Sequence, residues 1–137
     1  MITPPIVRRH TAQRYRLEAA KCKKCGKVFF PPRLICDACK AREFETVTLP
    51  NEGKVVTFTV IRTAPTGFGD LAPYCNAVVE LTDGTRIHCQ IADRDLVQDV
   101  EKEMPTIGMP VMLEMRRVQE DGESGVLAYA YKAVPDR

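Results

Sequence analysis

The segment Cys22-Lys23-Lys24-Cys25-Gly26 and the later segment Cys36-Asp37-Ala38-Cys39 decide the fold of this chain, and ten residues separate the two cysteine pairs. Each Cys-x-x-Cys turn directs two sulfur atoms toward one point, so two such turns supply four thiolates for a tetrahedral ion. A protein that provides all four ligands leaves no coordination position for water or substrate. The sequence therefore predicts a structural metal site in the first third of the chain, with the ligands Cys22, Cys25, Cys36 and Cys39.

Two disulfides or a redox dithiol are the alternatives to a metal. The N-terminus does not resemble a signal peptide, because Met1-Ile2-Thr3-Pro4-Pro5 leads directly into the charged run Arg8-Arg9-His10. Thiols stay reduced in an intracellular chain, and paired Cys-x-x-Cys motifs then indicate metal binding. Zinc is the expected ion, but the spacing also fits a rubredoxin-type iron, which takes four thiolates in the same tetrahedron.

Length and charge narrow the class of protein. The 137 residues suffice for a small metal-stapled module and one compact barrel. No apolar run approaches the ~20 residues of a membrane span, so we expect a soluble, cytoplasmic protein without a membrane partner. Residues 1–50 contain eleven Lys/Arg against four Asp/Glu, whereas residues 51–137 contain nine against fourteen. A basic first module attracts phosphates, nucleic acid or an acidic protein surface, although any single lysine is more simply a solvated side chain.

The first 50 residues contain mixed signals before the ribbon. Residues 7–20 fit both a helical and an alternating pattern, and we expect a short helix over 5–13 and a strand over 14–20. Residues 28–30 and 44–49 are expected to form ribbon strands, with Leu34 and Ile35 returning the chain to Cys36. The turn-forming run Pro50-Asn51-Glu52-Gly53 predicts a module boundary, with the ribbon in residues 1–50 and a second domain in residues 51–137.

Strands separated by turn signals follow this boundary. We expect strands over 54–62, 74–81, 86–91, 111–119 and 126–133, the first of them largely buried on both sides. Residues 63–73 are expected to form a long loop, and residues 93–104 an acidic helix. This order predicts a mainly β protein in which a rubredoxin-like ribbon precedes a five-stranded OB barrel.

The register of the hairpin around Thr82-Asp83-Gly84-Thr85 can be argued from its faces. A two-residue turn would pair Val79 with His88 and so mix apolar and polar side chains on one face. We therefore expect a pairing shifted by one residue, with Val79 opposite Cys89 and a bulged or three-residue turn. This pairing would leave Cys75 and Cys89 about 13 Å apart, which is too far for a disulfide.

The sequence offers little for catalysis. His88 is expected on the polar face of its strand, and His10 lies among arginines near the terminus. Cys89 is most simply a small core residue, and Cys75, beside the long loop, is expected to be the more exposed of the two thiols. No serine or cysteine is followed by a recognisable base and orienting acid, so we expect no catalysis by this chain alone.

Binding has better candidates. Phe29, Phe30, Pro32 and Arg33 would place an apolar ledge and a guanidinium beside the metal, although either Phe could equally close the small ribbon core. Arg14 and Arg16 are candidates for phosphate contacts. Phe68, between two glycines, suits an adaptable contact or a plain surface turn.

Several motifs occur in an order that resembles a known family. They are Gln13-Arg14-Tyr15-Arg16-Leu17-Glu18, the two cysteine pairs, Phe30-Pro31-Pro32-Arg33, Gly53-Lys54-Val55 and Ile107-Gly108-Met109-Pro110-Val111. Together they resemble the zinc-ribbon/OB-fold family of acyl-CoA-associated proteins, long catalogued as a domain of unknown function. The resemblance spans nearly the whole chain, and the cysteine pairs with Pro-Pro-Arg between them are its specific part.

The resemblance implies a non-catalytic adaptor. Members accompany thiolases and related condensing enzymes, and archaeal members bridge acetoacetyl-CoA thiolase and HMG-CoA synthase in the mevalonate route, the group that the Arg-Tyr-Arg-Leu segment resembles. The expected partners are therefore a thiolase and an HMG-CoA synthase-like enzyme, with CoA or acyl-CoA at the interface. The alternative is a nucleic-acid-binding module, which would have a basic barrel with stacking aromatics. The acidic barrel argues against it.

Overall fold

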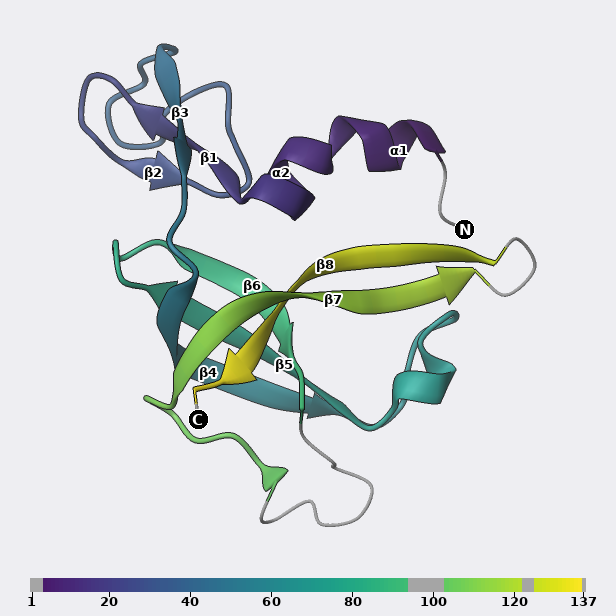
Figure 1. Ribbon diagram of the computed structural model, residues 1–137. Helices are drawn as coiled ribbons and strands as arrows, with labels where there is room; N and C mark the ends of the chain where they lie inside the picture. The colour runs from purple at the N-terminus through teal and green to yellow at the C-terminus, as the bar shows by residue number, and fades with distance from the viewer. Residues whose placement is uncertain (1–3, 94–102, 122–124, 137) are drawn as a thin grey trace.

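A computed structural model describes residues 4–93, 103–121 and 125–136 of the chain. It contains a three-stranded sheet and a closed five-stranded barrel, and two short helices precede the sheet (Figure 1). Within the described residues, no helix is long and apolar enough to cross a membrane. The mainly β architecture predicted from the sequence is confirmed.

The N-terminal segment is helical further along the chain than predicted. Helix α1 (Pro4–Arg9) and helix α2 (Thr11–Arg16) precede strand β1 (Glu18–Cys22). Leu17 between α2 and β1 has a left-handed backbone conformation, with φ of 50°. The expected strand over 14–20 was therefore wrong in its first half: the pattern fits both periods, and the left-handed turn at Leu17 is where the chain changes from helix to strand.

The small sheet has the order β2-β1-β3, with both pairings antiparallel. Strands β2 (Val28–Phe29) and β3 (Phe44–Thr48) agree with the predicted ribbon strands. The buried side chains Cys22, Phe29 and Cys36 form its core, and Phe44 packs against them. Leu34 and Ile35 return the chain to Cys36 as expected, and they do so in an exposed bend.

The barrel has five strands in the closed order β4-β5-β6-β8-β7. All neighbouring strands pair antiparallel except β6 and β8. Its strands are β4 (Glu52–Ile61), β5 (Tyr74–Leu81), β6 (Arg86–Ile91), β7 (Pro110–Asp121) and β8 (Val126–Pro135), and a short 3-10 helix η1 (Gly69–Leu71) lies in the β4–β5 loop. Strands β6 and β8 close the barrel by parallel pairing at Ile91 and Ala133. This is the OB topology that the strand order predicts. The helix expected over 93–104 lies mainly outside the described residues.

Strand β4 is less buried than expected. Val55 is 1% exposed, but Thr57 and Thr59 face solvent. The pairing with β5 shifts between Val55 and Thr57, which is a β-bulge. The bulge changes the phase of the alternation, so Val55, Phe58 and Val60 all pack into the core while the threonines turn outward.

The β5–β6 hairpin has a three-residue turn, but the shift has the opposite direction from the predicted one. Val79 lies opposite Ile87 and Ala77 opposite Cys89. Shifts in either direction restore one apolar face, so the hydrophobic pattern cannot distinguish them. Hydrogen bonds within the turn accompany the observed register: the carboxylate of Asp83 accepts from the backbone N–H and the hydroxyl of Thr85, both at 2.9 Å.

The observed register also corrects the expectations for the two remaining thiols. Cys75 is opposite Ile91, so it is displaced from Cys89 by two residues along the hairpin and not by four. Cys75 is 1% exposed, which contradicts its predicted exposure. Burial raises the pKa of Cys89 to about 11, so this thiol remains protonated and unreactive near neutral pH.

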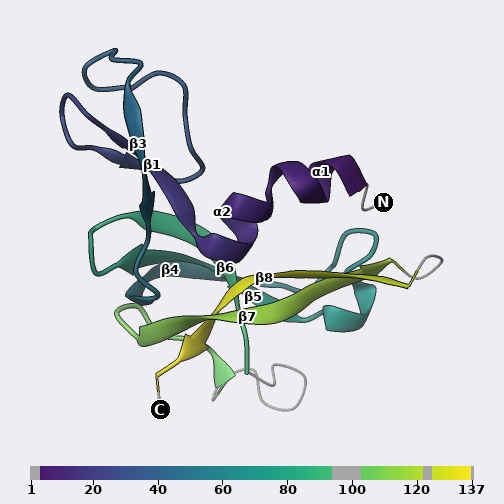
Figure 2. The same ribbon diagram turned by 45° about the horizontal axis from the view of Figure 1, so that its top comes forward.

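The ribbon and the barrel share one core. Leu17, Ala19 and Leu49 from the ribbon side pack in the same buried cluster as Val79 and Leu113 of the barrel. Helix α2 lies against β8 (Figure 2). The hydroxyl of Tyr131 on β8 donates to the Tyr15 carbonyl at 3.4 Å. The packing of the barrel therefore depends on the segment that carries the first metal ligand.

Candidate metal centre

Two matching turns present the four predicted metal ligands. In the first, the N–H of Gly26 donates to the carbonyl of Cys22 at 2.8 Å, and in the second the N–H of Lys40 donates to the carbonyl of Cys36 at 3.1 Å. Gly26 has φ of 75° and Lys40 has φ of 59°. Lys40 thus adopts the left-handed conformation that glycine provides in the first turn, so the two turns have the same backbone shape.

The four sulfur atoms gather at one point. The Sγ atoms of Cys22 and Cys39 are 3.5 Å apart, as are those of Cys25 and Cys36, and all four lie within 4.8 Å of one another. A tetrahedral ion with metal–sulfur bonds of about 2.3 Å requires sulfur–sulfur separations of about 3.8 Å. The donor set therefore fits a four-thiolate metal. Cys22 and Cys36 are buried and Cys25 is exposed, so the site lies at the edge of the ribbon.

Backbone amides prepare two of these sulfurs for coordination. The Cys25 amide lowers the pKa of Cys22, and the Cys39 amide lowers the pKa of Cys36 to about 6. The Lys27 amide acts in the same direction on Cys25, but the sulfur of Cys36 and burial outweigh it, and the net pKa of Cys25 rises. Close like charges explain this split, because four neighbouring thiols cannot all ionise without a cation among them. A bound metal would supply that charge.

Aromatic and ionic contacts surround the sulfurs. The rings of Phe29 and Phe44 meet edge to face at 6.0 Å. Lys27 and Arg33 lie against the Phe29 ring at 5.4 and 5.5 Å from its centroid, and Lys27 also pairs with Asp37 at 2.7 Å. Lys27 therefore connects the two turns. Phe29 is 6% exposed, so it serves the ribbon core and not an open ledge.

The structure brings together some of the predicted contact residues. Phe29, Phe30 and Arg33 line one groove of about 500 Å³ between the ribbon and the β5–β6 turn, where Lys27 and Arg86 add two more cations. Pro32 is exposed beside this groove. The carboxylates of Asp37 and Asp83 also line the groove, so its three cations exceed its carboxylates by one.

The other predicted contact residues lie elsewhere. Arg14 and Arg16 are exposed on α2, and Arg16 pairs with Glu18 at 2.5 Å. Phe68 packs against Tyr74 at 6.2 Å and lines a separate barrel cavity with His88 and Lys132. Burial lowers the pKa of Lys132 in that cavity. The seven candidates therefore do not form one site.

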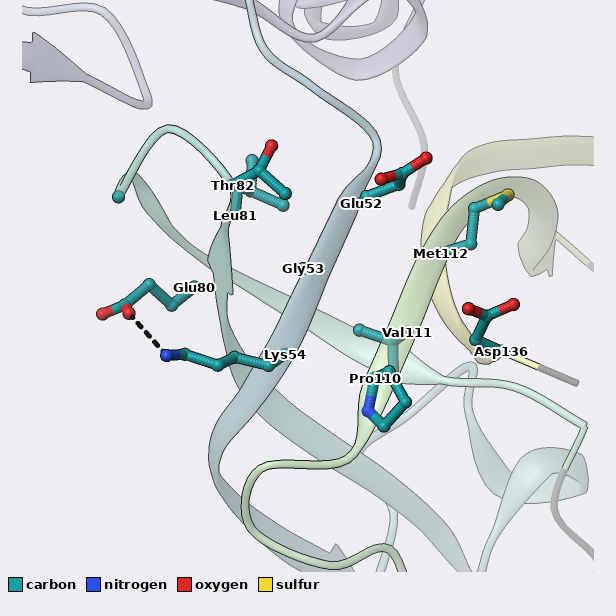
Figure 3. A pocket seen from close by; sticks show the side chains of 11 residues that line it. Glu52, Gly53, Lys54, Glu80, Leu81, Thr82, Pro110, Val111, Met112 and Asp136 are labelled. Atoms are coloured by element: carbon teal, nitrogen blue, oxygen red, sulfur yellow. Dashed lines mark ion pairs between the residues drawn. The ribbon is translucent and has the colours of Figure 1, made fainter.

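A further hollow brings two motifs of the sequence together. Gly53 pairs with Val111 and Lys54 with Pro110, so segments far apart in the chain are neighbours on β4 and β7 (Figure 3). Lys54 pairs with Glu80 at 3.4 Å. A Cβ at Gly53 would lie 2.6 Å from the Glu80 carbonyl oxygen, so this position requires glycine for close strand approach. The motifs Gly53-Lys54-Val55 and Ile107-Gly108-Met109-Pro110-Val111 therefore contribute to strand pairing in the barrel.

Sequence reasoning missed the most exposed apolar side chains. Leu34 is 88% and Ile35 47% exposed on the ribbon, in the segment that returns the chain to Cys36. A second group lies on the β7–β8 hairpin, and its members are Met115, Val126, Leu127 and Tyr129. The two prolines before Leu34 indicate the end of a strand, but they do not indicate whether the side chains that follow are buried or exposed.

The fold and the four-thiolate site define a class of protein: a rubredoxin-like metal ribbon joined to an OB barrel. Residues 9–45 match the family described as "ChsH2, rubredoxin-like zinc ribbon domain", and residues 46–116 match "ChsH2, C-terminal OB-fold domain". The chain belongs to this DUF35/ChsH2 zinc-ribbon and OB-fold family.

Relatives extend the match over most of the chain. A "DUF35 domain-containing scaffold protein" of Methanocaldococcus jannaschii is 44% identical over 128 residues, which covers 93% of this chain and 86% of the relative. The "Benzoylsuccinyl-CoA thiolase subunit BbsA" of Geobacter metallireducens is 36% identical over 75 residues, covering 55% of this chain and 49% of the subunit. Among solved structures, an "Ltp2-ChsH2(DUF35) aldolase" chain has a TM-score of 0.68 at 27% identity, covering 92% of this chain and 89% of that chain.

Proposed function

We propose that this protein is a non-catalytic scaffold in an acyl-CoA enzyme complex, and that it joins a thiolase to a condensing enzyme of the HMG-CoA synthase type in the mevalonate route. The observation that carries the proposal is the match to a scaffold protein over 93% of the chain. The relative that is a thiolase subunit and the aldolase complex support the link to acyl-CoA enzymes.

The geometry of the metal centre supports a structural role. Four protein thiolates fill a tetrahedral coordination sphere, so no position is left to activate water or substrate. The residues considered as catalysts do not lie together in a site. Cys75 and Cys89 are buried, whereas His88 is exposed on the other face of β6. We propose zinc as the ion and the cytoplasm as the location.

A scaffold of this kind would act through proximity. Condensation by a thiolase is unfavourable, and a synthase held beside it would draw the product forward through a raised effective concentration. An adaptor needs at least two contact surfaces. Exposed apolar side chains belong to the ribbon and to the β7–β8 hairpin. Figure 1 shows the ribbon and this hairpin in different parts of the molecule, which suits two partners.

We also propose a place for CoA. The groove beside the ribbon contains Lys27, Arg33 and Arg86 near the half-buried ring of Phe30, and the carboxylates of Asp37 and Asp83 also line it. Guanidinium and ammonium groups are suited to phosphates, and aromatic surface is suited to the adenine ring. Arg14, Arg16, Pro32 and Phe68 would then contact the partner enzymes and not the nucleotide.

The proposal is tested by affinity purification of the tagged protein from its native host at low salt, with identification of the proteins recovered by mass spectrometry. We expect a thiolase together with an HMG-CoA synthase in defined stoichiometry. Recovery of ribosomal proteins or nucleic acid without an acyl-CoA enzyme would overturn the proposal and favour the alternative, a nucleic-acid-binding module.

A further inference from the structure

The ribbon ends in an exposed aliphatic pair. Leu34 is 88% exposed and Ile35 is 47% exposed, and both belong to the segment of residues 31–35 that we call the ribbon tip. Neither side chain belongs to the ribbon core, which consists of Cys22, Phe29 and Cys36 with their neighbours. Leu34 therefore contributes little to folding in the isolated chain, while its exposure to water is unfavourable.

Both ends of the ribbon tip are held in place. On one side, the guanidinium of Arg33 lies 5.5 Å from the centroid of the buried Phe29 ring. On the other, Cys36 is 0% exposed, and its N–H donates to the Ala41 carbonyl at 2.9 Å. A short segment fixed at both ends loses little conformational entropy when it binds, which favours a role as a docking element.

The charges of the ribbon identify the kind of surface that would receive the tip. Exposed cations surround the two metal-binding turns, and five of them form no ion pair with any described residue: Lys23, Lys24, Arg33, Lys40 and Arg42. The carboxylates Asp37 and Glu45 are already paired, with Lys27 and Lys21, and Glu43 is the one further carboxylate among the described residues of this part of the ribbon, against the five cations. The free charge of the ribbon is therefore positive, and a complementary partner is acidic.

We propose that the ribbon tip is the docking element for one enzyme of the complex, with Leu34 inserted into an apolar pocket rimmed by carboxylates on that enzyme. This inference rests on the proposed function and adds the surface through which it works. Nucleic acid is disfavoured as the occupant, because aliphatic side chains do not stack on bases and the Phe29 ring is buried in the ribbon core, edge to face with Phe44. A membrane is disfavoured because two aliphatic side chains bury too little area for stable attachment.

The test uses the full-length, metal-loaded protein and the host's own thiolase and HMG-CoA synthase, each purified. Binding of Leu34→Glu to each enzyme is compared with wild type by surface plasmon resonance. Ile107→Glu is the matched control, because Ile107 is also an exposed aliphatic residue, at 73%, but lies in the turn that precedes barrel strand β7. Leu34→Met tests rescue by an apolar side chain of similar size. Metal content and the unfolding temperature of each variant establish that the ribbon remains folded.

We expect Leu34→Glu to raise the Kd for one of the two enzymes by about 10- to 100-fold, which corresponds to the loss of one buried leucine from the interface. Leu34→Met and Ile107→Glu should stay within about twofold of wild type. The double variant Lys23→Gln/Lys24→Gln should slow association and reduce its dependence on salt, because removing the cations weakens the long-range attraction.

Three results would overturn the inference, and they differ from failure of the proposed function. If wild type binds an enzyme and Leu34→Glu binds it equally well, the ribbon tip is not the docking element although the scaffold role stands. The same conclusion follows if Ile107→Glu weakens binding as much, or if Leu34→Glu loses affinity only for a DNA oligonucleotide or for anionic vesicles. If wild type binds neither enzyme, the proposed function and this inference both fail.

Discussion

Individual residues of the metal-binding turns show how closely backbone conformation and chemistry are connected. Gly26 and Lys40 occupy equivalent positions and both have positive φ. Their amides donate to the carbonyls of Cys22 and Cys36, the first cysteine of each pair, which closes each turn. A lysine in this position has strain that glycine does not, and it is retained here on an exposed surface of the ribbon.

Substitution at these two positions should have opposite effects. Lys40→Gly should stabilise the metal-loaded protein by roughly 0.5–1 kcal/mol, because glycine adopts the left-handed conformation without steric cost. Gly26→Ala should destabilise it by about 1 kcal/mol, since no atom lies within 4 Å of the added Cβ and only the backbone strain remains. Urea unfolding monitored by circular dichroism measures both, and the same sign for the two variants would contradict this account.

Loss of one metal ligand should unfold the ribbon. Cys36 is fully buried among the sulfurs, so Cys36→Ser should reduce bound metal far below one ion per chain and lower the unfolding temperature. Cys89→Ala is the control, because Cys89 lies in the barrel core and should leave the metal content unchanged. Elemental analysis of the purified variants measures the number of metal ions bound per chain. Full metal occupancy of Cys36→Ser would exclude this cysteine as a ligand.

At the scale of elements, close contacts between strands determine the shape of the barrel. Strand β4 approaches β5 so closely at Gly53 that an added Cβ would lie 2.6 Å from the Glu80 carbonyl oxygen and 2.8 Å from a methyl of Val79. Two positions later, a bulge changes which β4 side chains face the core. Close approach and bulge together allow one strand to pair with β5 on one side and with β7 on the other.

Gly53→Ala should therefore separate two strands. We expect destabilisation of about 2–4 kcal/mol, comparable to an overpacked core, because the obstructing atoms belong to backbone and to a buried valine. Gly69→Ala provides the control, as its Cβ would have no neighbour within 4 Å. Chemical denaturation of both variants measures the difference. Equal stabilities would show that β4 can shift without cost.

At the scale of the whole molecule, the ribbon and the barrel do not have separate cores. Leu17, Ala19 and Leu49 lie in the same cluster as the barrel residues Val79 and Leu113. Strand β1 contains Ala19 and ends at the metal ligand Cys22. Loss of the metal should therefore affect the barrel as well as the ribbon.

Removal of the metal should lower the stability of both parts. We expect a strong chelator to shift the main calorimetric transition to lower temperature while much of the barrel's strand signal remains in the far-ultraviolet circular dichroism spectrum. Restoring zinc should reverse the shift by mass action. A barrel transition that does not move on chelation would mean that the shared core contributes nothing to coupling.

Some features of this protein follow from local sequence. The spacing of Cys22, Cys25, Cys36 and Cys39 was enough to predict the metal ribbon, because ligand geometry within a turn depends on neighbouring residues alone. Alternating apolar residues between turn signals similarly predicted the number and order of the barrel strands. These patterns are local, so neighbouring residues were enough to interpret them.

Other features were decided only by tertiary structure. Both shifts of the β5–β6 hairpin keep one apolar face, and the hydrogen bonds of Asp83 to Thr85 accompany the one that formed. Residues 14–16 fit helix and strand equally in the sequence, and packing of α2 on β8 accompanies the helical outcome. Whether Leu34 is buried or exposed depends on what covers it in space. Sequence by itself determined the local geometry of ligands and strands, whereas register, helix extent and exposed surface required contacts between residues far apart in the chain.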